Sequence, residues 1–157
     1  MTREEIHEVY HRHLSAENNH DASAAAATYL DHGYYRVTPL GLHFTGRAAV
    51  EAQYAMSYVA FPDARFEIES EVLDGRWLFH AGTMHATASG PFFGQPPTGR
   101  PVQLSFSARI EFADGAMVGE TLWYDVASLC DQVGVPIEPV RQAAAVLAAQ
   151  VQGSTGS

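Results

Sequence analysis

Apolar residues near the start of the chain recur at the spacing of an α-helix. The first such stretch follows the capping box Thr2–Glu5, and its apolar side includes Tyr10 and His13. This pattern predicts a first helix of about 16 residues. The same spacing predicts two further helices, over 22–30 and 46–60.

Farther along the chain, apolar and polar residues alternate, which is the pattern of half-buried β-strands. The alternation predicts one hairpin that joins 65–73 to 76–87 and a second that joins 102–113 to 116–125. The dipeptide Asp-Gly stands at both turns, and it is a strong signal for a two-residue hairpin turn. We therefore expect two antiparallel strand pairs in the middle of the chain.

The remaining elements complete a single α+β domain. A strand over 34–38 precedes the third helix, a helix over 126–133 follows the second hairpin, and an alanine-rich helix covers 139–151. This order predicts a curved, largely antiparallel sheet with the N-terminal helices packed on its concave face and an extra C-terminal helix. We expect one domain over residues 1–152 and a flexible tail over residues 153–157.

The register of the first hairpin decides which of its side chains face the interior. If Leu73 faces Arg76, His85 lies on an apolar face that also carries aromatic side chains. His80 then lies on the opposite face beside Glu69, where we expect a surface ion pair that contributes little.

The second hairpin has one charged residue on its apolar face. If Ala113 faces Ala116, this residue is Asp125, while Glu120 lies on the other face opposite Arg109. Each hairpin thus presents one titratable group among aromatic side chains. Because convergent polar groups in an aromatic cavity are typical of ligand sites, we expect these two faces to line a pocket.

Two interpretations of Asp125 remain open from the residues alone. It stands directly before the helix over 126–133, where an aspartate commonly serves as the N-cap. A carboxyl on an apolar face can instead have a raised pKa and exchange protons near neutral pH. The loop over 89–100 decides whether His85 meets Asp125, and the sequence does not fix the pairing across it.

Composition excludes several classes of function. The nine basic residues are all arginine, so Schiff-base chemistry and the phosphate-loop lysine are excluded. A net charge of −9 argues against nucleic acid or an acidic membrane as partner. The single Cys130 offers no disulfide framework, and no apolar run is long enough to span a membrane. We expect a soluble, cytoplasmic protein.

Four segments together resemble a known family. They are FPDARFE at 61–67, GQPPTGRPV at 94–102, FADG at 112–115 and LCDQVG at 129–134. Over about residues 4–134 the chain is similar to the SnoaL-like polyketide cyclases of the NTF2-like superfamily. The resemblance implies a cone-shaped α+β fold, a homo-oligomer (dimer or tetramer), and neither cofactor nor metal.

The resemblance also implies a reaction and a site. The reaction is ring closure on a small, hydrophobic polyketide intermediate by intramolecular aldol condensation, a lyase or isomerase type of activity, with Asp125 as the acid/base. We expect His85 or Tyr35 to donate a hydrogen bond to the developing oxyanion. The residues expected to bind the substrate are aromatic: Tyr35, Trp77, Phe79, Phe92, Phe106 and Trp123.

One departure from the family pattern leaves other functions open. Family members commonly have the sequence THxG before the GxPPTGR segment, whereas this chain has alanine at the histidine position, Ala88. This change suggests a reshaped pocket. The alternatives are an ether-forming or epoxide-opening enzyme on the same fold and a non-catalytic protein that binds small molecules.

Overall fold

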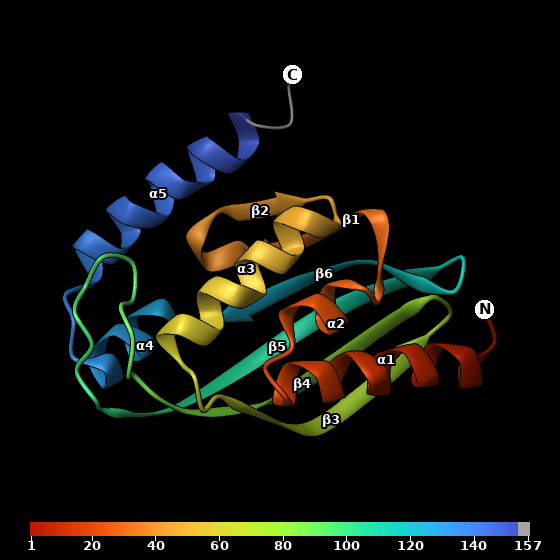
Figure 1. The fold of residues 1–157 in the computed structure, drawn as a ribbon. Coiled ribbons are helices and arrows are strands. Elements are labelled where there is room, and N and C mark those ends of the chain that lie inside the picture. The colour runs from red at the N-terminus through yellow and green to blue at the C-terminus, as the bar shows by residue number, and fades with distance from the viewer. Residues whose placement is uncertain (154–157) are drawn as a thin grey trace.

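Six strands form one strongly curved sheet in a computed structural model of the chain, which describes residues 1–153 (Figure 1). Their order across the sheet is β2-β1-β6-β5-β4-β3. β1 and β6 pair in parallel and all other neighbours pair antiparallel. The strands are β1 (Tyr29–Val37), β2 (Leu42–Thr45), β3 (Arg65–Asp74), β4 (Trp77–Thr87), β5 (Pro101–Ala113) and β6 (Ala116–Tyr124).

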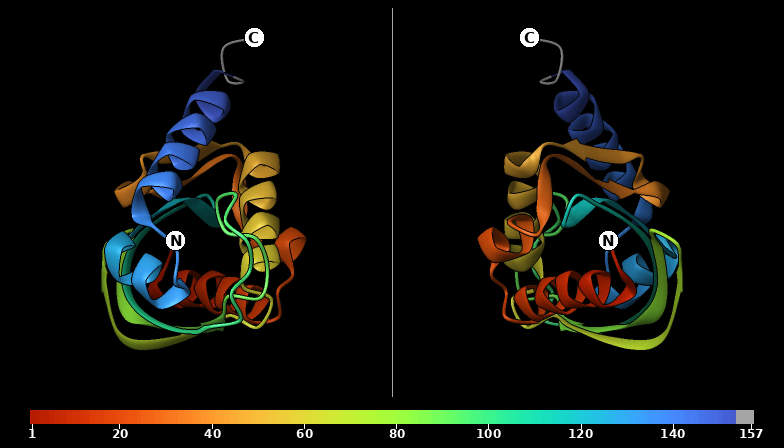
Figure 2. Two further views of the ribbon diagram at one scale, coloured as in Figure 1. Left: turned by 90° about the vertical axis from the view of Figure 1, so that its left-hand side faces the viewer. Right: turned by 90° about the vertical axis from the view of Figure 1, so that its right-hand side faces the viewer.

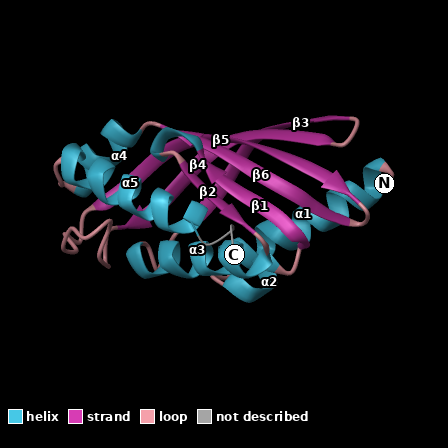
Figure 3. Cartoon of the chain, turned by 90° about the horizontal axis from the view of Figure 1, so that it is seen from above, coloured by secondary structure: helices cyan, strands magenta, loops and turns pink. Residues whose placement is uncertain are grey.

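The helices enclose the concave side of this sheet and extend beyond one end of it. Viewed from its ends, the molecule is a ring in which the sheet makes most of the wall and α1 lies inside the curve (Figure 2). Seen from above, α1, α2 and α3 follow one another along one side, while α4 and α5 gather at the end away from the N-terminus (Figure 3). The helices are α1 (Arg3–Asn18), α2 (Ala22–Ala26), the 3-10 turn η1 (Thr38–Leu40), α3 (Arg47–Ala60), α4 (Val126–Val133) and α5 (Ile137–Gly153).

The predicted α+β class and most predicted elements are confirmed. The capping box at Thr2 is present, and α1 has 16 residues. The helix predicted over 22–30 is wrong in its second half, because Tyr29 begins β1 and pairs with Met117. β2 has only four residues and was not predicted. Gly153 belongs to α5, and the rest of the predicted tail lies outside the described residues.

The register predicted for the first hairpin is wrong in two ways. Leu73 pairs with Leu78, so the turn lies one residue later than expected, and Glu69 is an extra residue that forms a β-bulge. On the side of the bulge away from the turn, the residues of β3 that were predicted to share a face with His85 share a face with His80 instead. His80 consequently points into the interior, and His85 lies on the convex face.

A second bulge changes the faces of the other hairpin. Ala113 pairs with Ala116 as predicted, but Phe112 pairs with Met117 and Glu111 with Gly119, which leaves Val118 as the extra residue. Every later side chain of β6 is thereby moved to the opposite face. The carboxyl of Glu120 is therefore buried, and Asp125 is exposed.

The loop between β4 and β5 is held against α4 by a side-chain hydrogen bond. Thr98 Oγ1 donates a hydrogen bond to the carbonyl of Val133 at 2.6 Å, at the last turn of α4. The Arg100 guanidinium lies against Gly134, where any side chain would overlap it. The GQPPTGR segment thus has a structural role, because it closes the C-terminus of α4.

No helix in the described part is long and apolar enough to cross a membrane.

Each bulge has a glycine at the point where the strands approach most closely. A Cβ at Gly82 would overlap the backbone carbonyl of Glu67 beside the first bulge, and one at Gly119 would overlap the ring of Tyr34. Glycine inside a strand is typical of a bulge or of a close backbone approach. Gly82 therefore requires the smallest residue, whereas a side chain at position 119 would require the ring of Tyr34 to move.

We expect Gly82→Ala to lower the free energy of unfolding by about 1–3 kcal/mol, because the backbone of β3 must move to admit the methyl group. Urea denaturation followed by circular dichroism measures this loss. Ser107→Ala on the exposed face of β5 is the control, with an expected change of about 0.5 kcal/mol or less. Equal stability of the two variants would contradict the close approach at Gly82.

Candidate functional site

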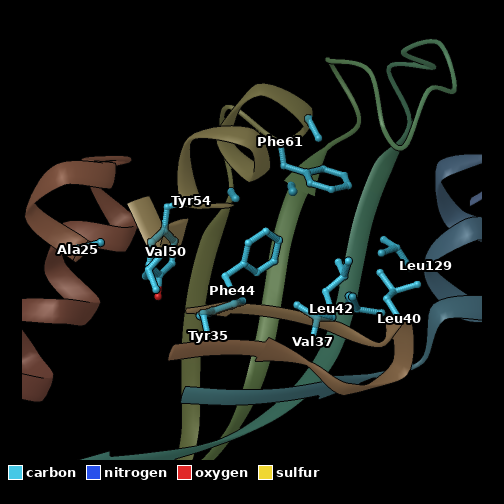
Figure 4. Close-up of a cluster of buried hydrophobic side chains, with 14 of the residues drawn as sticks. Ala25, Tyr35, Val37, Leu40, Leu42, Phe44, Val50, Tyr54, Phe61 and Leu129 are labelled. Carbon is cyan, nitrogen blue, oxygen red and sulfur yellow. The ribbon is translucent and has the colours of Figure 1, made fainter. Parts of the chain in front are cut away.

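A cavity of about 420 Å³ lies between the concave face of the sheet and α1 and α3. Its walls are mainly apolar, and they include Tyr35, Val37, Leu42 and Phe61, which belong to the cluster of buried side chains in Figure 4. Met56, on α3, also lines the cavity although it is exposed to solvent. A cavity of this size with apolar walls is typical of a site for a small organic molecule.

A cluster of buried polar side chains lies at one side of the cavity. Glu120 of β6 accepts hydrogen bonds from the hydroxyls of Tyr29, at 3.0 Å, and Tyr54, at 3.3 Å. His13 Nε2 of α1 lies 3.7 Å from Glu120 Oε2 and 3.6 Å from Glu17 Oε2. Four elements distant in sequence, α1, β1, α3 and β6, therefore bring two carboxyls, an imidazole and two phenols together.

The proton positions of His13 follow from its other neighbours. The hydroxyl of Thr28 donates to the carbonyl of Ala25 at 2.6 Å, so it accepts from His13 Nδ1, which lies 2.9 Å away. Burial opposes a charge on His13, but the carboxyls of Glu17 and Glu120 outweigh burial and raise its pKa. His13 is thus favoured as the cation of the cluster.

The two carboxyls of the cluster have pKa values shifted in opposite directions. Burial raises the pKa of Glu17 to about 7, and the charge of Glu120 adds to this while His13 opposes it. Burial also acts on Glu120, but His13 and the hydrogen bond from Tyr29 hold its pKa below the ordinary value. Glu120 is therefore the anion that pairs with His13, and Glu17 exchanges a proton near neutral pH.

Three polar atoms among the residues that line the cavity have no hydrogen-bond partner in the described part of the chain. They are Gln53 Oε1, the Tyr58 hydroxyl and His80 Nε2. The opposite ring atom of His80, Nδ1, lies 2.7 Å from the hydroxyl of Tyr10. Buried polar groups without partners are uncommon, so these atoms mark positions where a ligand can be bound.

The predicted catalytic residues lie outside this cavity. Asp125 is exposed, and its carboxylate accepts from the backbone N–H groups of Ala127 at 2.9 Å and Ser128 at 3.2 Å. The structure thus has Asp125 as the N-cap of α4, which is one of the two interpretations left open above. The side chain of His85 is 46% exposed and lies 3.6 Å from Glu67 on the convex face. The structure does not bring Asp125 and His85 to one site.

The predicted aromatic contacts divide between the two faces of the sheet. Tyr35, Phe92 and Phe106 line the cavity. Trp77, Phe79 and Trp123 do not line it. The bulge at Val118 moves Trp123 to the convex face, and Trp77 and Phe79 lie on the face of β4 opposite to that of His80. The Trp77 ring lies under the guanidinium groups of Arg76 and Arg109, at 5.5 Å and 4.8 Å from its centroid.

Sequence reasoning missed Glu17, Glu120 and the inward orientation of His80. A signal for Glu17 was present, since His13 belongs to the apolar side of α1 and Glu17 follows it by one turn on the same side. The signal for Glu120 was Gly119, a glycine inside a predicted strand, which indicates a bulge. If Gly119 is interpreted as the sign of a bulge, the predicted face of Glu120 is reversed.

His13, Glu17 and Glu120 could also provide ligands to a metal ion, because one donor atom from each lies within 4.8 Å of the others. His13 and Glu120 are already engaged with one another and with Thr28 and Tyr29. A cation bound at Nε2 would require His13 to be deprotonated, whereas the two carboxyls raise its pKa and favour the protonated ring. The contacts therefore favour an acid–base cluster.

Comparison with solved structures defines the class of fold. A protein from Catenulispora acidiphila DSM 44928 with a "ketosteroid isomerase-like protein fold", in complex with trimethylamine, has a TM-score of 0.72 and 16% identity, over 83% of this chain and 95% of the other. AclR from Streptomyces galilaeus, described as a "putative hydroxylase", has a TM-score of 0.74 and 21% identity, over 86% and 100%. The chain has this NTF2-like cone, as predicted.

The family follows from the sequence. Residues 7–133 match the sequence profile of the SnoaL-like polyketide cyclases, and the chain therefore belongs to this family. A "putative SnoaL-like polyketide cyclase" from Jannaschia sp. CCS1 has a TM-score of 0.76 and 17% identity, over 84% of this chain and 93% of the other. No curated protein matches the chain.

Glu17 should make the stability of the fold depend on pH. Because its folded pKa is about 7 against an ordinary 4.5, its contribution to stability is complete below pH 4.5 and is lost as the pH rises to 7. We expect Glu17→Gln, which has no proton to lose, to melt at a higher temperature than the wild type at pH 8 and at a similar temperature near pH 4.5. Thermal melts across this range measure the difference.

Glu8→Gln is the matched control for this experiment, because Glu8 lies on the exposed side of the same helix. Its melting temperature should follow that of the wild type at every pH. The same pH dependence in the wild type and in Glu17→Gln would show that the carboxyl of Glu17 titrates normally.

Proposed function

We propose that this protein is a cofactor-independent cyclase that closes a ring on an extended, largely apolar polyketide-type intermediate, with Glu17 as the acid/base. The observation that carries this proposal is a carboxyl with a pKa of about 7 that lines an apolar cavity. An acid/base is most effective when its pKa is near the working pH. Membership of the SnoaL-like polyketide cyclase family supports the same class of reaction.

The proposed step is an aldol-type ring closure that needs only proton transfer. The Glu17 carboxylate removes a proton from a carbon next to a carbonyl, and the resulting enolate carbon attacks a second carbonyl of the same molecule. One carbon–carbon bond forms, and the new alkoxide takes the proton back from Glu17. Substrate and product are isomers, so no other reactant is consumed.

The ion pair of His13 and Glu120 sets the properties of Glu17 in this scheme. The Glu120 anion disfavours a second negative charge nearby, whereas the His13 cation favours it. Their opposing effects keep Glu17 able both to lose and to regain a proton. Because both partners are buried and hydrogen-bonded, the environment of Glu17 stays fixed during the reaction.

The shape of the cavity would contribute the rest of the acceleration of the reaction. An extended chain confined in about 420 Å³ must fold back on itself, which brings its two reacting carbons together. Correct placement of two tethered groups can lower a barrier by several kcal/mol. The apolar walls suit an uncharged carbon skeleton better than a phosphorylated one.

We expect Glu17→Gln to lower the rate of ring closure by about 10²- to 10⁴-fold, because the variant keeps the size of the side chain but cannot accept the proton. The assay is a panel of linear poly-β-carbonyl esters of graded length, with cyclised product measured by mass and absorbance. The opening of 5-nitrobenzisoxazole, which needs only a base, reports proton abstraction independently. The wild-type rate should depend on a group with a pKa near 7.

Asp125→Asn is the matched control, since it removes the carboxylate that the family resemblance implies as the acid/base while keeping most of the ability to cap α4. We expect its rate to stay within about two-fold of the wild type. A large loss in Asp125→Asn, together with full activity in Glu17→Gln, would transfer the role of acid/base to Asp125. Full activity in both variants would refute this mechanism.

We also propose that the protein forms a homo-oligomer through the convex face of the sheet. Val72 and Phe79 are paired neighbours on this face and, with Trp123, are 64%, 46% and 37% exposed, so the face offers apolar surface to a second copy. Sedimentation velocity should show a dimer or a tetramer, and Phe79→Glu should dissociate it. A monomeric wild type at micromolar concentration would contradict the proposal.

A further inference from the structure

His80 is a buried side chain that the mechanism above does not use. It projects from β4, is 6% exposed and lines the cavity. The ring packs at 5.6 Å from the centroid of Tyr10 and, edge to face, at 5.7 Å from that of Phe106. One ring nitrogen is bonded and the other, Nε2, has no partner among the described residues.

The contact with Tyr10 fixes the tautomer of His80. Nδ1 of His80 is the only hydrogen-bond partner of the Tyr10 hydroxyl in the described part of the chain, at 2.7 Å. If Nδ1 carried the proton, neither the hydroxyl hydrogen of Tyr10 nor the lone pair of Nε2 would have a partner, whereas with the proton on Nε2 only that N–H group lacks one. The hydroxyl therefore donates to Nδ1, and the proton of the neutral imidazole is on Nε2.

We propose that the Nε2–H group of His80 binds a carbonyl oxygen of the substrate and stabilises the oxyanion that forms there, with Tyr10 as the residue that positions it. This inference rests on the proposed function, because it assigns a second catalytic residue to the same cavity. A buried donor without an acceptor is unfavourable by about 1–3 kcal/mol, and a bound carbonyl would remove that cost. A donor fixed in place before the reaction is most effective for a developing negative charge.

The environment of His80 keeps its ring neutral. Burial lowers the pKa of His80, and the positive charge of His13 acts in the same direction, whereas Glu120 and Glu71 oppose it. A neutral donor stabilises an enolate without transferring a proton to the oxygen. The proton removed from carbon then remains on Glu17, where the ring-closing step needs it.

The other two unpartnered atoms extend the description of the ligand. Gln53 Nε2 donates to Ser57 at 3.0 Å, so its Oε1 is free to accept from a hydroxyl, and the Tyr58 hydroxyl can donate or accept. The fitting ligand is thus an uncharged ketone that also carries at least one hydroxyl group. Its remaining surface is apolar, to match the phenylalanine and leucine side chains of the walls.

The tautomer can be measured directly in the wild-type protein. Long-range ¹⁵N–¹H correlation spectra of histidine-labelled protein distinguish Nε2–H from Nδ1–H. We expect His80 to be in the Nε2–H form at neutral pH, and Tyr10→Phe to populate both forms. A wild-type ring in the Nδ1–H form, or a doubly protonated one, would overturn the assignment.

Binding of 2-acetylnaphthalene labelled with ¹³C at its carbonyl tests the ligand chemistry. Difference infrared spectra should show the carbonyl band of the bound ketone at a lower frequency in the wild type than in His80→Leu. We expect His80→Leu to weaken binding by about 3- to 10-fold, the effect of one lost hydrogen bond. His80→Gln keeps an N–H donor and should restore the low-frequency band, and Tyr10→Phe should broaden it.

His85→Gln, on the convex face, is the control that should leave the band unchanged. An identical band in the wild type and His80→Leu, or no binding of the ketone to the wild type, would overturn the proposal. If His80→Leu fails to fold, the comparison of the wild type with Tyr10→Phe and His80→Gln decides it. Glu17→Gln should keep the low-frequency band, so a failure of the acid/base mechanism can be told apart from a failure of this inference.

Discussion

Side chains on a β-strand alternate strictly between two faces, so one extra residue exchanges interior and exterior for the rest of the strand. Two such residues, Glu69 and Val118, determine the chemistry of this molecule. The first bulge brings Phe66 and Ile68 to the concave face beside Met84, and the second brings Glu120 there. Without the second bulge, Glu120 would lie on the convex face, and the cavity would lack its anion.

The buried charges of the cluster are stabilised by one another and by neutral hydroxyls. Moving a carboxylate and an imidazolium out of water is costly unless they are paired and their remaining hydrogen-bonding atoms are satisfied. Thr28, Tyr29 and Tyr54 provide those partners for His13 and Glu120. Burial raises the pKa of Glu17 and the charge of Glu120 adds to this, while His13 and a hydrogen bond from Tyr54 offset the rise only in part. Its destabilised carboxylate is what makes this position suited to proton transfer.

The polar atoms of the cavity are divided between satisfied and unsatisfied groups. The His13 cluster is closed by hydrogen bonds, whereas His80, Gln53 and Tyr58 each leave one atom without a partner on the apolar side. An apolar cavity with a few such atoms orients a ligand through them, because the surrounding walls offer no competing polar contact. The loop that carries Phe92 lines the cavity and is held against α4 by the hydrogen bond of Thr98, so this wall has a defined shape.

The sequence by itself determined most of the elements, the family and the α+β class, because helix caps, apolar periodicity and Asp-Gly turns are local signals. It also placed His13 on the buried side of α1. The sequence did not reveal which face of each strand is concave, because a bulge depends on the fit between two strands and changes no local pattern except its glycine. For this reason Asp125 and His85 lie outside the cavity while Glu120 and His80 face it. The pKa of Glu17 was likewise decided by tertiary structure, since it depends on burial and on the charges of His13 and Glu120, which meet only in the folded protein.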